Sequence, residues 1–495
     1  MFTRLRQLVS PYKLLLPLCF GVFIAADDMT VVVTLLPDML ADLRVGVSEL
    51  DRASWSITGY LIGFTAAMPL MGRISDRTGY RKAFLLAMAV FTLGSALVAV
   101  SPDIPRWLYG GAPEYNWLIG ARVFQAIGGG AVIPISIAAA GQLVDDKHRA
   151  IAYGLIGASA EAGGVFGPLW GGGITTWFSW EWAFWFNIPL TLIASIWIMR
   201  NPPAKRNNVK IDVPAATVFA AALTTLTIGL VRIGEPDVLM AASLGATAVL
   251  GVVLVILNNR AQDPLFPKKL FKLPSFNFSN LTHFLVGAVL IIAMVTVPLM
   301  AASVYEKSPL EGGLQLLRMT FAIGVGAILG GYITQRFGAR LPAMVGLVIT
   351  TAGFLLLSSW TVDIAEPALT IHLAITGVGL GLLVSPIVET ALWGVQNDQR
   401  GAASALLSVS RMIGMTAGLA SMTALGTVQF HELVTDVPAF SLDPEVQQQI
   451  IDSATYAGVT VFTRFYLYGA VLSAMALIPA WFMTRSKPVL GNEKN

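Results

Sequence analysis

The stretch that decides the fold is GRISDRTGYRK, residues 72–82, which lies between two apolar runs at about 54–72 and 83–101. A degenerate copy, GYITQRFGAR at residues 331–340, lies between two later apolar runs, and its Gly, Arg, Gly and Arg fall in the same register. The same short, basic, glycine-bounded loop at two equivalent places predicts a chain built from two similar helical halves.

The composition around these loops is that of a membrane protein. Of the 495 residues, 55% are hydrophobic and 12% are charged, whereas about a quarter are charged in an ordinary soluble domain. The net charge of +3 is too small to indicate a nucleic-acid partner. The single cysteine, Cys19, excludes a disulfide framework and a cysteine-based zinc cluster. We therefore expect an all-α membrane protein.

Apolar runs long enough to cross a membrane, which takes about 20 residues, predict fourteen transmembrane helices. They lie near 14–37, 54–72, 83–101, 116–143, 150–174, 182–199, 213–231, 238–257, 276–304, 313–334, 342–361, 366–390, 402–429 and 460–484. The internal repeat divides them into an N-terminal six-helix bundle (1–200), an inserted two-helix linker (201–270) and a C-terminal six-helix bundle (271–495).

The charged residues predict how the chain is threaded. With the N-terminus in the cytoplasm, most of the 32 Lys and Arg residues fall in cytoplasmic loops and tails, and most of the 29 Asp and Glu residues fall on the other side. We therefore expect a multi-pass protein of the bacterial cytoplasmic (inner) membrane with both termini in the cytoplasm. The N-terminal segment is basic and then apolar, like a signal peptide, but no cleavage site follows, so we expect it to be retained.

The 72–82 loop resembles the signature cytoplasmic loop of the major facilitator superfamily, and the positions that match are Gly72, Asp76, Arg77, Gly79 and Arg81. The resemblance implies a fold of two six-helix bundles and a role for this loop as a conformational latch. Its partner would be the helix that starts near Gly401 and Ala402. The glycine lets helices approach closely, and the aspartate suits the positive N-terminus of a helix. The alternative is a plain basic loop.

Span five carries a second motif, GGVFGPLWGG at residues 163–172, which is similar to the motif of antiporters in this superfamily. Its small residues allow tight helix crossing, and its proline removes a backbone hydrogen-bond donor. The residues that we expect to form a hinge are Gly163, Gly167, Pro168, Gly171 and Gly172. Ordinary small-residue packing is the alternative, and the two readings are compatible.

Further stretches extend the resemblance to the fourteen-helix drug:proton antiporter branch. The stretches at 122–131, 27–33 and 180–189 resemble the motifs of spans four, one and six, although Ala126 stands where Gly is usual. The stretches at 58–70 and 157–161 look closest to the lipoprotein-partnered mycobacterial exporters of triacylglycerides and drugs. The resemblance covers most of the N-terminal half and weakens in the C-terminal half.

Ionisable residues inside the spans are the candidate coupling residues, because a charge at mid-membrane costs at least about 2.5–3.5 kcal/mol. Asp27 and Asp28 lie about 20 Å into span one, and Glu161 and Arg411 lie near the middle of equivalent spans. We predict that Glu161 and one of the two aspartates carry protons, with Arg122 and Arg411 as partners. The alternative is a set of permanently neutralised pairs that hold helices together.

Other polar residues are weaker candidates. Arg318, Glu389 and Arg464 lie near span ends, where a long charged side chain can reach the interface. The four His residues show no metal-ligand spacing, and no Walker-type phosphate loop is present. We therefore expect no metal site, no cofactor other than the proton gradient as driving force, and no enzyme activity.

The longest segment outside the membrane, about 430–460, contains a predicted helix start at Asp443, Pro444 and Glu445. A single helix from there to Arg485 would be about 64 Å long, roughly twice the thickness of the hydrocarbon core. The resemblance implies that this extension helps to pass lipid to a periplasmic lipoprotein carrier. The alternative is a short surface helix followed by a kink, because the DSATYAG stretch weakens a helix.

The sequence thus predicts a monomeric, proton-coupled exporter of hydrophobic or amphipathic compounds, such as triacylglycerides or lipophilic drugs, that works by alternating access. Its expected partners are membrane lipids, its cargo and a periplasmic lipoprotein carrier, and no nucleic acid. Two other classes remain open. One is a non-transporting sensor or lipoprotein-docking scaffold on the same fold, and the other is an importer of a small solute, which would need more polar residues at mid-span.

Overall fold

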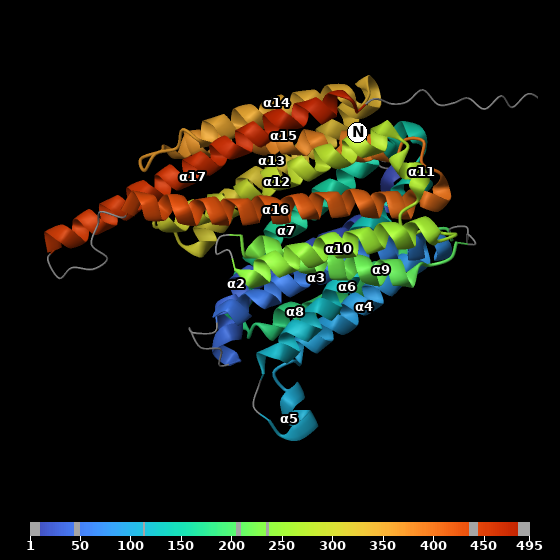
Figure 1. The fold of residues 1–495 in the computed structure, drawn as a ribbon, viewed down its shortest axis with the longest axis horizontal. Coiled ribbons are helices and arrows are strands. Elements are labelled where there is room, and N and C mark those ends of the chain that lie inside the picture. Colours follow the sequence, from blue (N-terminus) through green and yellow to red (C-terminus); the bar gives the residue numbers. More distant parts are fainter. Residues whose placement is uncertain are drawn as a thin grey trace, which may run out of the picture.

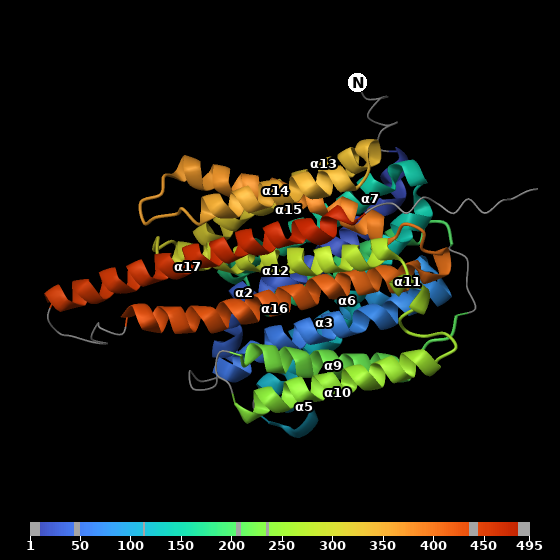
Figure 2. The ribbon, with the colours of Figure 1, turned by 45° about the horizontal axis from the view of Figure 1, so that its top comes forward.

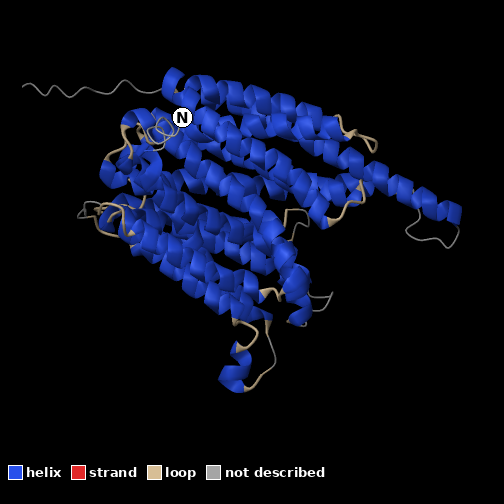
Figure 3. Cartoon of the chain, turned by 180° about the vertical axis from the view of Figure 1, so that it is seen from behind, coloured by secondary structure: helices blue, strands red, loops and turns tan. Residues whose placement is uncertain are grey.

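The computed structural model describes residues 10–43, 50–111, 114–203, 209–233, 237–434 and 444–483. Within these ranges the chain is helical, with short connecting loops and no strand (Figure 3). The predicted all-α fold is therefore confirmed.

Six long helices form the first group. They are α2 (Leu16–Asp42), α3 (Leu50–Thr78), α4 (Tyr80–Ala99), α6 (Tyr115–Leu143), α7 (Arg149–Trp177) and α8 (Glu181–Ile198). The short elements η1 (Ser10–Leu15), α5 (Ile104–Tyr109) and η3 (Asp146–His148) precede or connect them. Within the group, α2 packs on α7, and α6 packs on both α3 and α4.

Two helices, α9 (Val213–Val231) and α10 (Val238–Arg260), follow as a hairpin. Each begins at an aspartate whose carboxylate accepts a backbone hydrogen bond: Asp212 from Ala215 N at 3.1 Å, and Asp237 from Met240 N at 2.7 Å. Helix α9 packs on α3, whereas only 6% of the apolar window of α10 is buried. The hairpin therefore lies on the outside of the bundle, beside α3 (Figures 1 and 2).

The second group of long helices follows the short α11 (Lys268–Phe271). It comprises α12 (Pro274–Ser303), α13 (Pro309–Phe337), α14 (Arg340–Leu357), α15 (Glu366–Ala391), α16 (Arg400–Val434), which η4 (Asn397–Gln399) precedes, and α17 (Pro444–Trp481). A capping box starts α13, in which Ser308 and Glu311 exchange hydrogen bonds. Helix α15 packs on α13 and α14, and α12 packs on α16 and α17.

The two groups lie side by side and meet through equivalent helices (Figures 1 and 2). Helix α3 packs on α16, and α7 packs on α13. Since α3 and α13 are the second helices of their groups, and α7 and α16 the fifth, the two contacts are related by the internal repeat. The residue limits of the halves and of the linker remain predictions.

The number of membrane spans can be compared with the fourteen that the sequence predicts. Twelve long helices in the described ranges are apolar enough to cross a membrane by length and composition. The helices α3 and α7, of 29 residues each, are not among them, because glycine, serine and threonine lower the mean hydropathy of their central stretches. The number of fourteen spans therefore stays a prediction.

The last helix settles the question of the extension. Helix α17 runs unbroken from Pro444 to Trp481, 38 residues or about 57 Å, and its Pro444 end projects past the other long helices (Figures 1 and 2). The alternative of a separate surface helix and a kink is wrong, because the DSATYAG stretch stays helical within α17. The helix ends at Trp481 and not at Arg485. The predicted cap Asp443 lies outside the described residues.

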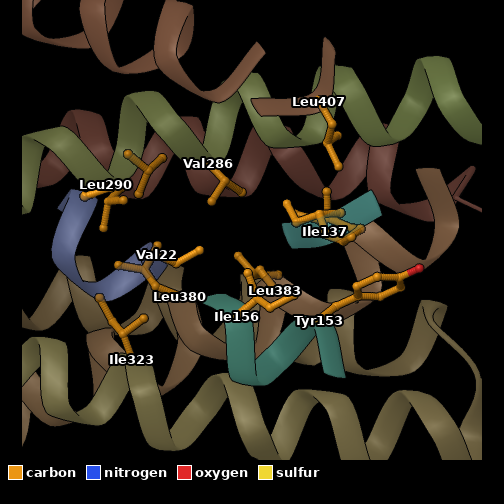
Figure 4. Close-up of a cluster of buried hydrophobic side chains, with 14 of the residues drawn as sticks. Val22, Ile137, Tyr153, Ile156, Val286, Leu290, Ile323, Leu380, Leu383 and Leu407 are labelled. Atoms are coloured by element: carbon orange, nitrogen blue, oxygen red, sulfur yellow. The ribbon is translucent and has the colours of Figure 1, made fainter. Parts of the chain in front are cut away.

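The end of the bundle that carries the 72–82 loop, which we call the latch end, is closed by a buried apolar cluster. Figure 4 shows Val22 of α2 and Ile156 of α7 near Val286 of α12 and Leu383 of α15. The cluster draws on both groups of helices, so apolar side chains seal the bundle at this level.

Candidate functional site

The predicted latch contact is present. The Asp76 carboxylate, at the end of α3, accepts hydrogen bonds from the backbone N–H groups of Gly401 at 2.7 Å and Ala402 at 3.0 Å, at the start of α16. Arg73 lies 3.6 Å from the same carboxylate. A Cβ atom on Gly72 would collide with the Gly401 carbonyl. A buried carboxylate thus caps a helix of the opposite group, and glycine makes the approach possible.

The other residues of the loop have separate positions. Gly79 has a φ of 84°, which favours glycine, and it begins α4 directly after α3. Arg81 donates a 3.2 Å hydrogen bond to the carbonyl of Asn201, and Arg77 is exposed. These residues therefore shape the loop within the first group and do not contact the second in any hydrogen bond or ion pair described.

The second copy of the loop makes the mirrored contact without the carboxylate. Gly331 packs against the backbone of Ala150 and Ile151 at the start of α7, as Gly72 packs against Gly401. Gln335 occupies the place equivalent to Asp76. The repeat is thus retained in shape, but the charged clamp is built from the N-terminal copy.

More hydrogen bonds join the two groups at the latch end. Arg400 donates to the Gly141 carbonyl, Ser404 donates to the Pro134 carbonyl at 2.8 Å, and Ser385 donates to the Ala150 carbonyl. The described contacts between the groups therefore gather at this end, which is the closed end of the bundle.

A buried polar network lies inside the first group. Asp28 of α2 forms a 2.8 Å ion pair with Arg122 of α6, and its other oxygen accepts hydrogen bonds from Gln125 and Asn187, both at 2.8 Å. The guanidinium also stacks 4.1 Å from the centre of the Tyr60 ring. Asp28 and Arg122 are 0% and 1% exposed, so the charges compensate each other in place.

Asp27 points elsewhere and has no such compensation. It is 6% exposed, and its Oδ1 atom is buried without a hydrogen-bond partner among the described residues. The backbone of Asp27 touches Gly163 and Gly167 of α7. The structure therefore separates the two neighbouring aspartates, one in a complete network and the other at the contact of α2 with α7.

The glycine-rich motif of α7 packs on α2. A Cβ atom on Gly163, Gly167 or Gly171 would collide with atoms of α2, whereas nothing lies within 4 Å of the position that one on Gly172 would take. Pro168 lies inside the helix, which continues through it. The packing reading is therefore confirmed for Gly163, Gly167 and Gly171, and the hinge remains a prediction.

The two groups are joined near mid-helix by an ion pair. Arg411 of α16 donates to the Glu161 carboxylate of α7. The Glu161 side chain is 5% exposed, and that of Arg411 is 21% exposed. The structure thus brings together the two residues that the sequence placed at equivalent depths in the two halves.

Sequence reasoning missed His283 of α12, which lines a small cavity of about 20 Å³ together with Glu161 and Arg411. Its Nδ1–H donates to the Leu407 carbonyl at 2.9 Å, since a carbonyl can only accept. The Nε2 atom is then the basic ring nitrogen. A lone histidine in an apolar helix gives no signal for this position, because only the packing of α12 on α16 creates it.

A family model described as Major Facilitator Superfamily matches residues 18–419. The chain belongs to the Major Facilitator Superfamily. It is therefore a transporter of that superfamily, a multi-pass membrane protein and not an enzyme.

Among the curated relatives of this superfamily member are mycobacterial transporters. It is 31% identical to a triacylglyceride transporter of Mycobacteroides abscessus, with 88% of each chain covered. It is 34% identical to a triacylglyceride transporter of Mycolicibacterium hassiacum, with 84% of this chain and 79% of the relative covered.

Solved structures of the superfamily share the fold. The human organic anion transporter TETRAN matches with a TM-score of 0.60 at 17% identity, covering 94% of this chain and 99% of that one. The E. coli fucose:proton symporter matches with a TM-score of 0.60 at 12% identity, covering 95% and 98%.

The three weaker candidates, Arg318, Glu389 and Arg464, have different surroundings. Arg318, in the third turn of α13, pairs at 2.6 Å with Glu366 at the start of α15. Glu389 is buried at the latch end, whereas Arg464 is exposed and lies within 4 Å of no described carboxylate. In the described part of the chain, no group of three His, Cys, Asp or Glu residues is placed to hold a metal ion.

Proposed function

We propose that this transporter exports hydrophobic molecules by alternating access and couples each cycle to inward proton movement. The observation that carries the proposal is the Glu161–Arg411 ion pair, which joins α7 of one half to α16 of the other. A charge pair across the moving interface links the protonation state of one side chain to the position of two bundles.

Protonation of Glu161 would weaken the pair. The ionised carboxylate needs Arg411 because an unpaired charge is costly inside a membrane. Once the carboxyl group is neutral, it can leave the guanidinium, and the halves can separate at this level. Arg411 would remain beside His283 on its own half, where Nε2 offers a neutral acceptor. Proton uptake would therefore favour opening of the closed end.

Of the two aspartates, we assign Asp27 as the second proton carrier. Asp28 already has a guanidinium and two amide donors as partners, so its oxygens are committed to a fixed network. The buried Oδ1 of Asp27 has no described partner, so a proton there removes an uncompensated charge. Asp28 and Arg122 would act as a fixed support for α2.

The direction of the cycle rests on the predicted topology, with both termini in the cytoplasm of a bacterial cell. The Asp76 latch and its neighbouring hydrogen bonds then close the cytoplasmic side, and release of this latch would accompany inward opening. We propose that the protein works as a monomer in the cytoplasmic membrane.

The cargo that we propose is a lipid such as a triacylglyceride, together with lipophilic drugs. This proposal is supported by two relatives that are named triacylglyceride transporters and are 31% and 34% identical over most of both chains. The projecting segment of α17 suits transfer of such a cargo beyond the membrane to a lipoprotein carrier, because the helix is nearly twice as long as the hydrocarbon core is thick.

The test is transport in proteoliposomes with an imposed pH gradient. We would compare a fluorescent triacylglyceride and a lipophilic cation dye for wild type, Glu161→Gln and Asp27→Asn. The matched control is Glu366→Gln, which removes an exposed carboxylate that is also paired with an arginine.

Gradient-dependent transport that both interior variants lose and the control retains would support the proposal. Full transport by Glu161→Gln would remove Glu161 from the coupling mechanism. Transport of neither cargo by the wild type would favour the docking scaffold.

A further inference from the structure

An apolar groove lies between α12, α16 and α17, away from the coupling site. It has a volume of about 370 Å³, within the range of small-molecule sites. Helix α12 forms its floor and is seen between α16 and α17 in both ribbon views (Figures 1 and 2). Its walls include Ala417, Ser421 and Leu425 of α16 and Phe465, Tyr468 and Val471 of α17.

The groove opens outward, toward the membrane. Leu425 and Val471 are 45% and 52% exposed although they line it. Ala405 of α16 packs in a cluster with side chains of α3, and positions 405 and 421 are about 160° apart around an α-helix. The groove is therefore on the side of α16 that faces away from the first group of helices.

A polar rim closes the groove at the end far from the latch. The Gln429 amide nitrogen donates a 2.9 Å hydrogen bond to the Tyr468 hydroxyl, whose own hydrogen remains available to an acceptor. Gln429 lies about 43 Å along α16 from Arg400. The rim thus lies near the far surface of a membrane whose hydrocarbon core is about 30 Å thick.

A cation stands one helical turn beyond this rim. Arg464 and Tyr468 are four residues apart on α17, so they share a face. Arg464 is exposed, and no carboxylate among the described residues lies within 4 Å of its guanidinium. An arginine without an internal counter-ion at the membrane surface is available to a phosphate group.

We propose that this groove binds a glycerophospholipid of the leaflet at the far surface. One acyl chain lies between α16 and α17 on α12, an ester carbonyl accepts from the Tyr468 hydroxyl, and the phosphate pairs with Arg464. The three contacts follow the order of chain, ester and phosphate in such a lipid. A triacylglyceride carries no charge and would leave Arg464 unpaired, so the groove selects membrane lipid and not the proposed cargo.

The lipid would connect α16 to α17 just below the segment of α17 that projects from the bundle. This site is independent of proton coupling, because the groove residues do not contact Glu161 or Arg411 in any described interaction. Loss of the lipid is expected to loosen α17 against α16 and leave the latch end unchanged.

The test uses two probes with the same diazirine-labelled acyl chain, phosphatidylglycerol and triacylglyceride, at equal mole fraction in vesicles of the phosphate-free lipid digalactosyldiacylglycerol that contain the full chain. After photolysis, mass spectrometry would locate the labelled peptides. The variants are Ser421→Trp, which fills the groove, Tyr468→Phe and Arg464→Gln. The controls are Ile478→Trp, at an exposed site of α17 outside the groove, and Lys307→Gln, an exposed cation elsewhere.

We expect phosphatidylglycerol to label groove peptides of wild type and both controls, and Arg464→Gln to lower this labelling about fivefold, the effect of one surface arginine. Ser421→Trp should abolish it. Equal labelling by the triacylglyceride probe, or labelling by phosphatidylglycerol that Ser421→Trp and Arg464→Gln leave unchanged, would overturn the proposal. Because labelling needs no pH gradient, its result is separate from that of the transport assay.

Discussion

Replacing Asp76 with Asn removes the negative charge from the closed end of the transporter at nearly constant volume. The carboxylate uses one oxygen for Gly401 N–H and the other for Ala402 N–H. An asparagine has a single acceptor oxygen, so one buried N–H loses its partner, at a cost of about 1–3 kcal/mol. The lost interaction with the start of α16 adds about 0.3–1 kcal/mol.

With values from the lower part of both ranges, the two losses together lower the stability of the closed state relative to the open state by about 2 kcal/mol. Since about 1.4 kcal/mol changes an equilibrium tenfold, the ratio of closed to open molecules should fall roughly 30-fold. Arg73, which lies 3.6 Å from the original carboxylate, would lose its ionic partner in the closed state. This loss would destabilise the closed state further.

Distances between spin labels on the two halves would measure this shift. After Cys19→Ser, which removes the single cysteine, labels would be placed at two exposed residues of the latch end, Arg77 and Phe337. The Asp76→Asn variant should show a larger population at long distance. Asp146→Asn, which removes an exposed carboxylate at the same end, should match the unsubstituted protein. An unchanged distance distribution in well-folded Asp76→Asn would refute the latch.

Three further substitutions test the interior. Gly167→Val should lower the free energy of unfolding by about 1–3 kcal/mol, because the new side chain collides with α2. Thermal unfolding in detergent measures this loss. The control is Gly172→Val, whose side chain meets open space and should leave the stability nearly unchanged. Arg122→Gln should lower the free energy of unfolding by about 3–5 kcal/mol in the same assay, since it leaves the buried carboxylate of Asp28 without its cation. The control is Arg232→Gln, which breaks an exposed ion pair and should change the stability by less than about 1 kcal/mol. His283→Phe should slow pH-driven transport severalfold with a stability loss of only about 0.5–1.5 kcal/mol, and equal transport rates would show that Arg411 does not need the imidazole.

The sequence by itself determined the class and the repeat of this protein. Composition placed the chain in a membrane, because 12% charged residues cannot cover a soluble surface. The two glycine-bounded loops predicted the duplicated bundle, and they pack at equivalent places on α16 and α7. Regular spacing along the chain also predicted that Glu161 and Arg411 lie at similar depths, since depth along a helix follows from residue number.

What only the tertiary structure decided is which side chains meet across helices. Asp27 and Asp28 are adjacent in sequence, yet α6 and α8 complete the bonds of one and leave an oxygen of the other without a partner, because neighbouring helix positions point about 100° apart. His283 joins the Glu161–Arg411 pair, and Arg464 stands above an apolar groove, through the packing of α12 on α16 and α17. Apolar residues cover every face of such helices, so the sequence does not show which face of a helix turns inward. The rotation of each helix about its axis is set when the helices pack together.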